Sequence, residues 1–124
     1  MEACATVKRK GENGTWITRQ IIESYTELFE RGFAGSFEVC SGQGDLVGGT
    51  YGVMHGNYFS AESMFHAADN ASKFALFAAV EYLRAKGVDW IDVQVMNPFL
   101  ESLGCREVSR AEFTVMLKDS WLLR

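Results

Sequence analysis

The chain has 124 residues, of which 48% are apolar and 13% aromatic, with one proline and a formal net charge of −4. This composition can form a hydrophobic core and excludes a disordered chain, so we expect one domain over residues 1–124. The acidic balance argues against strong non-specific nucleic-acid binding, and the lack of a long apolar run or a signal-peptide pattern predicts a cytoplasmic protein without a membrane partner.

The first half of the chain is predicted to form one helix and three antiparallel strands. Residues 16–31 carry apolar side chains at helical spacing, with Thr15 as a candidate N-cap and Gly32 as a stop. Two glycine-containing turns then separate three β-rich runs. These runs cover residues 36–40, 46–54 and 58–64.

A long helix and a short strand are predicted next. Asn70 is a candidate N-cap for a helix that runs to about residue 86 and ends at Gly87. Apolar residues on several sides of this helix indicate that it is well buried. A buried strand is expected over residues 90–95.

The last part of the chain is predicted to be helical. A short helix over residues 98–103 is stopped by Gly104. Ser109 and Glu112 have the spacing of a capping box at the start of a final helix. A strand over residues 113–117 is the alternative for this segment.

The order of these elements predicts an α/β (α+β) fold with a mixed, largely antiparallel sheet flanked by helices. This order also matches the GNAT acyltransferase architecture. The acetyl-CoA enzymes of that architecture hold a pyrophosphate with a glycine-containing loop at the start of a helix. Residues 65–73 form that junction here and contain no glycine, and Asp69 adds a negative charge, so acetyl-CoA is disfavoured as a donor.

Two polar residues interrupt the apolar strand expected over residues 90–95. Asp92 and Gln94 are two positions apart, so on a regular strand both side chains project from the same face. Such a pair is a candidate for proton handling. The alternative is structural, because Asp92 can accept backbone N–H bonds at a strand end, and Gln94 and Asn97 can cap strand ends.

Eight short segments occur along the chain in a fixed order and at fixed relative spacing. Four of them are Glu62-Ser63-Met64-Phe65, Asn70-Ala71-Ser72-Lys73, Ile91-Asp92-Val93-Gln94 and Ser102-Leu103-Gly104. The others are Thr15-Trp16-Ile17, Gly35-Ser36-Phe37-Glu38, the run from Leu46 to Val53, and Arg110-Ala111-Glu112-Phe113. Together they resemble the C-terminal, GNAT-like half of leucyl/phenylalanyl-tRNA–protein transferases, over about residues 4–117.

The resemblance implies an aminoacyltransferase that moves leucine or phenylalanine from aminoacyl-tRNA onto proteins beginning with Arg or Lys, which marks them for degradation. It assigns Asp92 and Gln94 to catalysis, with Asp92 acting through Gln94 to assist removal of the amine proton. It assigns Glu62 to the basic side chain of the acceptor, which suits a carboxylate. The alternative for Glu62 is an ion pair with Lys73 or Arg84.

The resemblance also implies an apolar pocket for the donor side chain. Thr50 and Ala79 stand where larger apolar residues are usual, so this pocket is expected to be roomier and slightly more polar. We place Asn97 among the substrate-binding residues as well. The donor-pocket positions are Thr50, Phe59, Leu76, Ala79, Leu83 and Ile91. Aminoacyl-tRNA is the co-substrate, no cofactor is expected, and three widely spaced cysteines indicate no metal site.

Family members of this kind carry an N-terminal domain that helps to build the donor pocket and grips the acceptor end of the tRNA. This sequence has no counterpart to that domain, so we expect a partner chain that supplies it, or a homodimer formed through the uncovered surface. The competing hypothesis is a GNAT-like binding module without turnover. Such a module would recognise a peptide N-terminus or a small amine through Glu62 and Asp92.

Overall fold

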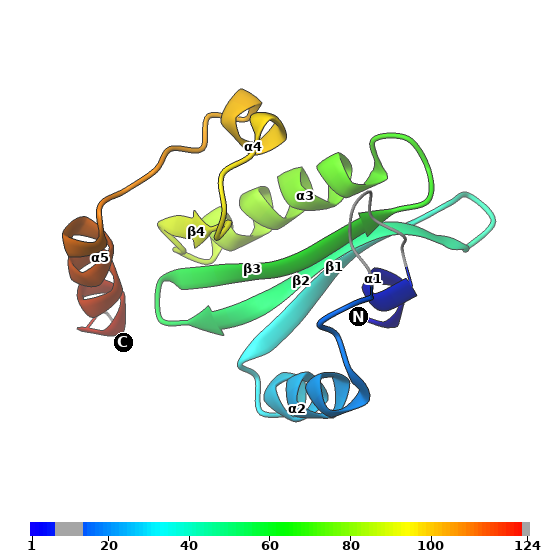
Figure 1. Ribbon diagram of the computed structural model, residues 1–124, viewed down its shortest axis with the longest axis horizontal. Helices are drawn as coiled ribbons and strands as arrows, with labels where there is room; N and C mark the ends of the chain where they lie inside the picture. Colours follow the sequence, from blue (N-terminus) through cyan, green and yellow to red (C-terminus); the bar gives the residue numbers. More distant parts are fainter. Residues whose placement is uncertain (7–13, 123–124) are drawn as a thin grey trace.

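The computed structural model describes residues 1–6 and 14–122 and contains a four-stranded sheet in the order β1-β2-β3-β4 (Figure 1). The strands are β1 Ala34–Cys40, β2 Leu46–His55, β3 Tyr58–His66 and β4 Trp90–Asp92. The first three strands are antiparallel, and β4 runs parallel to β3. The predicted mixed, largely antiparallel sheet is therefore confirmed.

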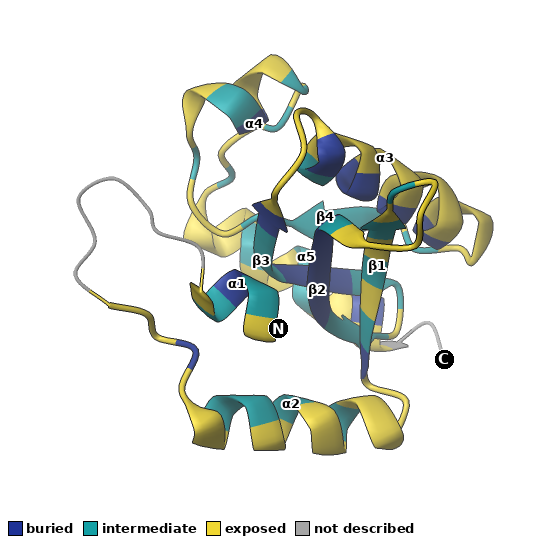
Figure 2. Cartoon of the chain, turned by 90° about the vertical axis from the view of Figure 1, so that its right-hand side faces the viewer, coloured by how far each residue is buried: buried dark blue, intermediate teal, exposed yellow. Residues whose placement is uncertain are grey.

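Helices cover both faces of this sheet (Figures 1 and 2). They are α1 Glu2–Thr6, α2 Arg19–Glu30, α3 Ala71–Ala85, α4 Pro98–Ser102 and α5 Arg110–Leu122. α3 packs on one face, α1 and α2 pack on the other, and α5 stands beside the turn between β2 and β3. The final segment is thus a helix, and the alternative of a strand there is wrong.

Two clusters of buried side chains form the core, one on each face of the sheet. The α3 face buries Phe59, Ala61, Ala79 and Leu83. The opposite face buries Cys4, Ile17, Tyr51 and Phe65, against which α1 and α2 place partly buried apolar side chains. Both faces of β3 therefore contribute to the core, and polar side chains on this strand need hydrogen-bond partners.

Helix α2 begins three residues later than the sequence predicts. The hydroxyl of Thr15 accepts a bond from the Ile17 amide (3.1 Å), which forms a local turn in place of a helix start. Thr18 is the N-cap instead, and its side chain accepts from the Ile21 amide (3.4 Å). The turn at Thr15 therefore decides which of the two threonines caps α2.

The predicted glycine stops are confirmed at the ends of three helices. Gly32 follows α2 with a φ of 80°, its amide donates to Phe29 O (2.9 Å), and the Phe33 amide donates to Leu28 O (2.8 Å). This pair of bonds satisfies carbonyls at the end of the helix and requires a left-handed residue, which glycine adopts without a Cβ penalty. Gly87 after α3 and Gly104 after α4 have the same arrangement.

The predicted helix caps of the second half are only partly present. Asn70 precedes α3 in the left-handed conformation (φ 63°), and its side chain makes no cap bond. Asn70 thus stands at the predicted N-cap position, but the predicted side-chain cap is absent. Before α5, the Ser109 hydroxyl accepts from the Glu112 amide (3.2 Å), but the Glu112 carboxylate pairs with Arg106 (2.8 Å) instead of completing a capping box.

The turn between β2 and β3 fits closely against α5. Gly56 has a φ of 56°, and a Cβ added there would lie 2.0 Å from Ser120 O. We expect Gly56→Ala to lower the free energy of unfolding by about 2 kcal/mol, because the left-handed conformation is strained and the helix must also move. Gly44→Ala, at a φ of 92° with nothing nearby, is the control for strain alone. If denaturant unfolding gives the same loss of unfolding free energy in both variants, the contact between the Gly56 turn and α5 contributes nothing.

Candidate active site

β4 ends at Asp92, and the chain then makes a tight turn. Gln94 has a φ of 67°, and the Val95 amide donates to Val93 O (2.9 Å), which forms a γ-turn centred on Gln94. The prediction that Asp92 and Gln94 project from the same face of one regular strand is therefore wrong. The turn, and not strand alternation, sets the direction of the Gln94 side chain.

A register shift in the sheet determines where Glu62 points. Tyr51 pairs with Ser63 and Gly52 pairs with Ala61, so Glu62 has no partner on β2. Such an extra residue is a β-bulge, a feature that redirects side chains and is common beside active sites. The Ser60 hydroxyl donates to Glu62 Oε1 (2.7 Å) and holds the redirected carboxylate.

Hydrogen bonds join Asp92, Gln94 and Glu62. The backbone amide of Gln94 donates to Asp92 Oδ1 (2.7 Å), and Gln94 Nε2 donates to Glu62 Oε2 (3.1 Å). The structure thus brings together the three residues that the sequence singled out. The bond from Asp92 to the Gln94 backbone also agrees with the structural alternative for Asp92. Among the described residues, neither Lys73 nor Arg84 forms an ion pair with Glu62. The Lys73 ammonium lies 5.4 Å from the centre of the Phe99 ring.

Two tyrosines extend this group of residues and were not predicted as site residues. The Tyr58 hydroxyl donates to Asp92 Oδ2 (3.4 Å). Tyr25 of α2 approaches Glu62, and its pKa is raised to about 12 by burial first and then by the charge of Glu62 and hydrogen bonding to it. Tyr58 could have been found from strand spacing, because it lies two positions before Ser60 on β3. Nothing in the sequence distinguishes Tyr25 from the other apolar residues of its helix.

A cavity of about 280 Å³ lies beside Glu62 and Gln94. Its apolar wall includes Trp16 and Phe99. Asn97 also lines it, but the Asn97 Oδ1 accepts from the Leu100 amide (2.9 Å) and caps α4. The cavity therefore combines a carboxylate at one side with aromatic walls.

Five of the six predicted donor-pocket positions lie between α3 and the sheet, where core side chains fill the space. Phe59, Ala79 and Leu83 are at most 1% exposed, and Ile91 packs against them. Leu76 is buried on α3, and Thr50 is buried with its hydroxyl donating to Ser63 O (3.1 Å). A donor side chain bound there would have to displace part of this packing, and the assignment of the pocket stays a prediction.

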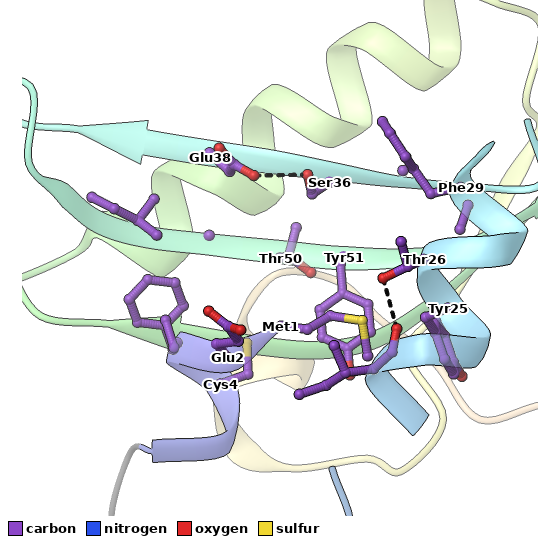
Figure 3. Close-up of a pocket in the computed structure, with 17 residues that line it drawn as sticks. Met1, Glu2, Cys4, Tyr25, Thr26, Phe29, Ser36, Glu38, Thr50 and Tyr51 are labelled. Atoms are coloured by element: carbon purple, nitrogen blue, oxygen red, sulfur yellow. Dashed lines mark hydrogen bonds between the residues drawn. The ribbon is translucent and has the colours of Figure 1, made fainter. Parts of the chain in front are cut away.

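A larger cavity, of about 570 Å³, lies on the opposite face of the sheet (Figure 3). It is bounded by α1, α2, β1 and β2. Tyr25 and Tyr51 contribute rings to its wall, and the two rings meet edge to face with centroids 5.6 Å apart. On β1, the Ser36 hydroxyl donates to the Glu38 carboxylate (2.9 Å) at the same cavity. No pattern in the sequence predicts this cavity.

Comparison with known proteins decides the family. The family model for leucyl/phenylalanyl-tRNA protein transferases matches residues 1–118. The chain belongs to this family. The leucyl/phenylalanyl-tRNA–protein transferase of Pseudoalteromonas atlantica is 53% identical over 118 residues, which cover 95% of this chain and 50% of the relative. That of Flavobacterium johnsoniae is 49% identical over 116 residues, which cover 94% of this chain and 54% of the relative.

The chain spans about half the length of the curated transferases it matches. A solved acetyltransferase from Bacillus cereus matches 67% of this chain and 69% of its own, with a TM-score of 0.43 and 18% identity. This likeness is too low to bear on the function of a transferase-family chain. Within the described residues, none of the helices combines the length and apolar character needed to cross a bilayer.

Proposed function

We propose that this chain carries the site of an aminoacyltransferase that moves leucine or phenylalanine from aminoacyl-tRNA to the N-terminus of proteins beginning with Arg or Lys. The observation that supports the proposal is the hydrogen-bonded series of Asp92, Gln94 and Glu62 beside a cavity. Glu62 lies at a β-bulge and Gln94 lies in a strained turn. Both features are common at functional sites.

The reaction is aminolysis of an ester. The neutral α-amine of the acceptor attacks the ester carbonyl carbon, a C–N bond forms, and the C–O bond to the tRNA breaks. A proton must leave the amine, and the departing ribose oxygen must gain one. Asp92 fixes the backbone of Gln94, and the Gln94 amide contacts Glu62. In this arrangement Gln94 orients the attacking amine, and the negative charge of the Asp92 carboxylate favours loss of a proton from that amine.

The cavity beside Glu62 suits the basic side chain of the acceptor. A lysine or arginine side chain has an apolar stem and a cationic end. Trp16 and Phe99 would contact the stem, and Glu62 would bind the cation. This combination distinguishes Arg- or Lys-initiated proteins from those with short or acidic first residues.

Aminoacyl-tRNA, and not acetyl-CoA, is the donor in this proposal. The amides of Ala67 and Ala68, just before α3, both donate to Val47 O (2.8 and 3.2 Å). These two amides are therefore engaged, and Asp69 adds a negative charge before α3, so both features disfavour a bound pyrophosphate at this junction. Because the net charge of these 124 residues is −4, the basic residues that bind the tRNA phosphates would come from outside them.

The proposal is tested by transfer of labelled phenylalanine from Phe-tRNA to an Arg-initiated peptide by the intact chain. Replacing the Glu62 carboxylate by an amide in Glu62→Gln is expected to raise the KM for this peptide about tenfold, because a charged hydrogen bond to the acceptor is lost. Glu38→Gln is the matched control, since Glu38 also accepts from a serine two positions before it. Peptide binding without transfer would favour the binding module, and neither binding nor transfer would overturn both.

A further inference from the structure

We propose that Tyr58 is a positioning residue for Asp92 and that α5 holds Tyr58 in place through Trp90. The inference rests on the proposed aminoacyl transfer, in which Asp92 must keep one orientation. It concerns two aromatic residues outside the hydrogen-bonded series described above. A continuous set of contacts joins α5 to the Asp92 carboxylate.

The first contact is between Tyr58 and Asp92. Tyr58 and Ser60 lie opposite Trp90 and Asp92 in the parallel β3–β4 ladder. The Tyr58 hydroxyl donates to Asp92 Oδ2 (3.4 Å), while Oδ1 accepts from the Gln94 amide (2.7 Å). Each carboxylate oxygen therefore has its own donor, one from β3 and the other from the turn after β4. Removing either would free the carboxylate to rotate.

The second contact is between Tyr58 and Trp90. The two rings pack with centroids 4.5 Å apart. Trp90 Nε1 donates to the hydroxyl of Ser120 on α5 (2.9 Å), and Ser120 is only 3% exposed. The Phe113 ring of α5 meets Trp90 edge to face at 5.8 Å. α5 thus fixes Trp90 by one hydrogen bond and one ring contact, and Trp90 limits the positions open to the Tyr58 ring.

The protonation of Tyr58 is consistent with this role. Burial raises the pKa of Tyr58, a hydrogen bond with Ser60 opposes the rise, and the charge of Asp92 adds to it. The phenol therefore stays protonated throughout the neutral range. It remains a hydrogen-bond donor wherever the transfer reaction would be measured.

Tyr58→Phe tests the positioning role, because it removes the hydroxyl and keeps the ring on Trp90. We expect kcat for transfer to an Arg-initiated peptide to fall about tenfold, the low end for loss of one hydrogen bond to a charged group, with KM unchanged. Tyr82→Phe is the matched control, since Tyr82 is exposed on α3, on the other face of the sheet. Its kcat is expected to equal that of the original chain.

Two results would overturn the inference in this assay. One is an unchanged kcat in Tyr58→Phe. The other is a fall in kcat accompanied by a lower thermal unfolding midpoint, which would indicate a purely structural role. If the original chain does not transfer phenylalanine, the proposed function fails. A second measurement then tests the contact between Tyr58 and Asp92 by itself.

That measurement is the ultraviolet titration of tyrosinate, taken as the difference between the chain with Tyr58 and its Tyr58→Phe variant. The Asp92→Asn substitution removes a negative charge beside the phenol, so the Tyr58 pKa should be lower in the Asp92→Asn background. An unchanged Tyr58 pKa would show that the two groups do not interact, and would overturn the inference whether or not the chain is an enzyme.

Discussion

Asp92→Asn is expected to lower transfer from Phe-tRNA to an Arg-initiated peptide about a hundredfold or more, the range typical for loss of a group that assists proton transfer. The substitution changes the charge and keeps the shape. An asparagine oxygen can still accept from the Gln94 amide, which now donates to Asp92 Oδ1 (2.7 Å). The turn after β4 should therefore survive, and the lost rate should fall mainly on kcat.

The control for this change is Asp89→Asn. Asp89 is an exposed carboxylate close by in the sequence, and its Oδ2 accepts from Asn57 Nδ2 (3.3 Å). Transfer should be unaffected in this variant, and both variants should have the circular dichroism and unfolding midpoint of the original chain. A similar loss in both would mean that charge near β4, and not the Asp92 carboxylate, governs the reaction. Full activity of Asp92→Asn would remove Asp92 from the mechanism.

Gly52→Ala is expected to lower the free energy of unfolding by about 3 kcal/mol, at the upper end for an overpacked core position. A Cβ at this position would lie 2.1 Å from Ser60 O and 2.5 Å from the end of the Phe59 ring. Neither neighbour can easily move, because Ser60 is held in the β-ladder and Phe59 is 0% exposed. Since Gly52 adjoins the bulge, the variant should also misplace Glu62.

Urea unfolding of the purified chain measures this loss. Gly42→Ala is the control, since Gly42 is exposed in the turn between β1 and β2 and no atom lies within 4 Å of a Cβ added there. It should change stability by no more than about 0.5 kcal/mol. If Gly52→Ala were as stable as Gly42→Ala, β2 and β3 could not pack as closely at the bulge as the structure has them.

The order of helices and strands could be predicted because its signals are local. A glycine such as Gly32 ends a helix through its own backbone freedom, and turn residues mark the hairpins wherever they occur. The resemblance of short segments to the transferase family also assigned Asp92, Gln94 and Glu62 to one site. The start of α2 was misplaced because Thr15 and Thr18 are equivalent by residue type and differ only in the bonds that they form.

The features that were missed depend on contacts between distant parts of the chain. The bulge at Glu62 is a mismatch between β2 and β3, so neither strand reveals it alone. The closeness of Tyr25 to Glu62 depends on which face of the sheet α2 covers. Residue type marked Phe59 and Leu83 as apolar positions for a donor pocket, but it could not show that these two side chains are buried in the core themselves.

The γ-turn after β4 lowers the stability of the fold at Gln94, and it also holds the Gln94 side chain in the position that the proposed reaction needs. A glutamine with a φ of 67° costs about 1 kcal/mol relative to a glycine, which adopts the same backbone freely. A glycine at position 94 would make folding easier but would leave no amide to reach Glu62. The fold therefore gives up some of its stability to keep this amide in place before any substrate arrives.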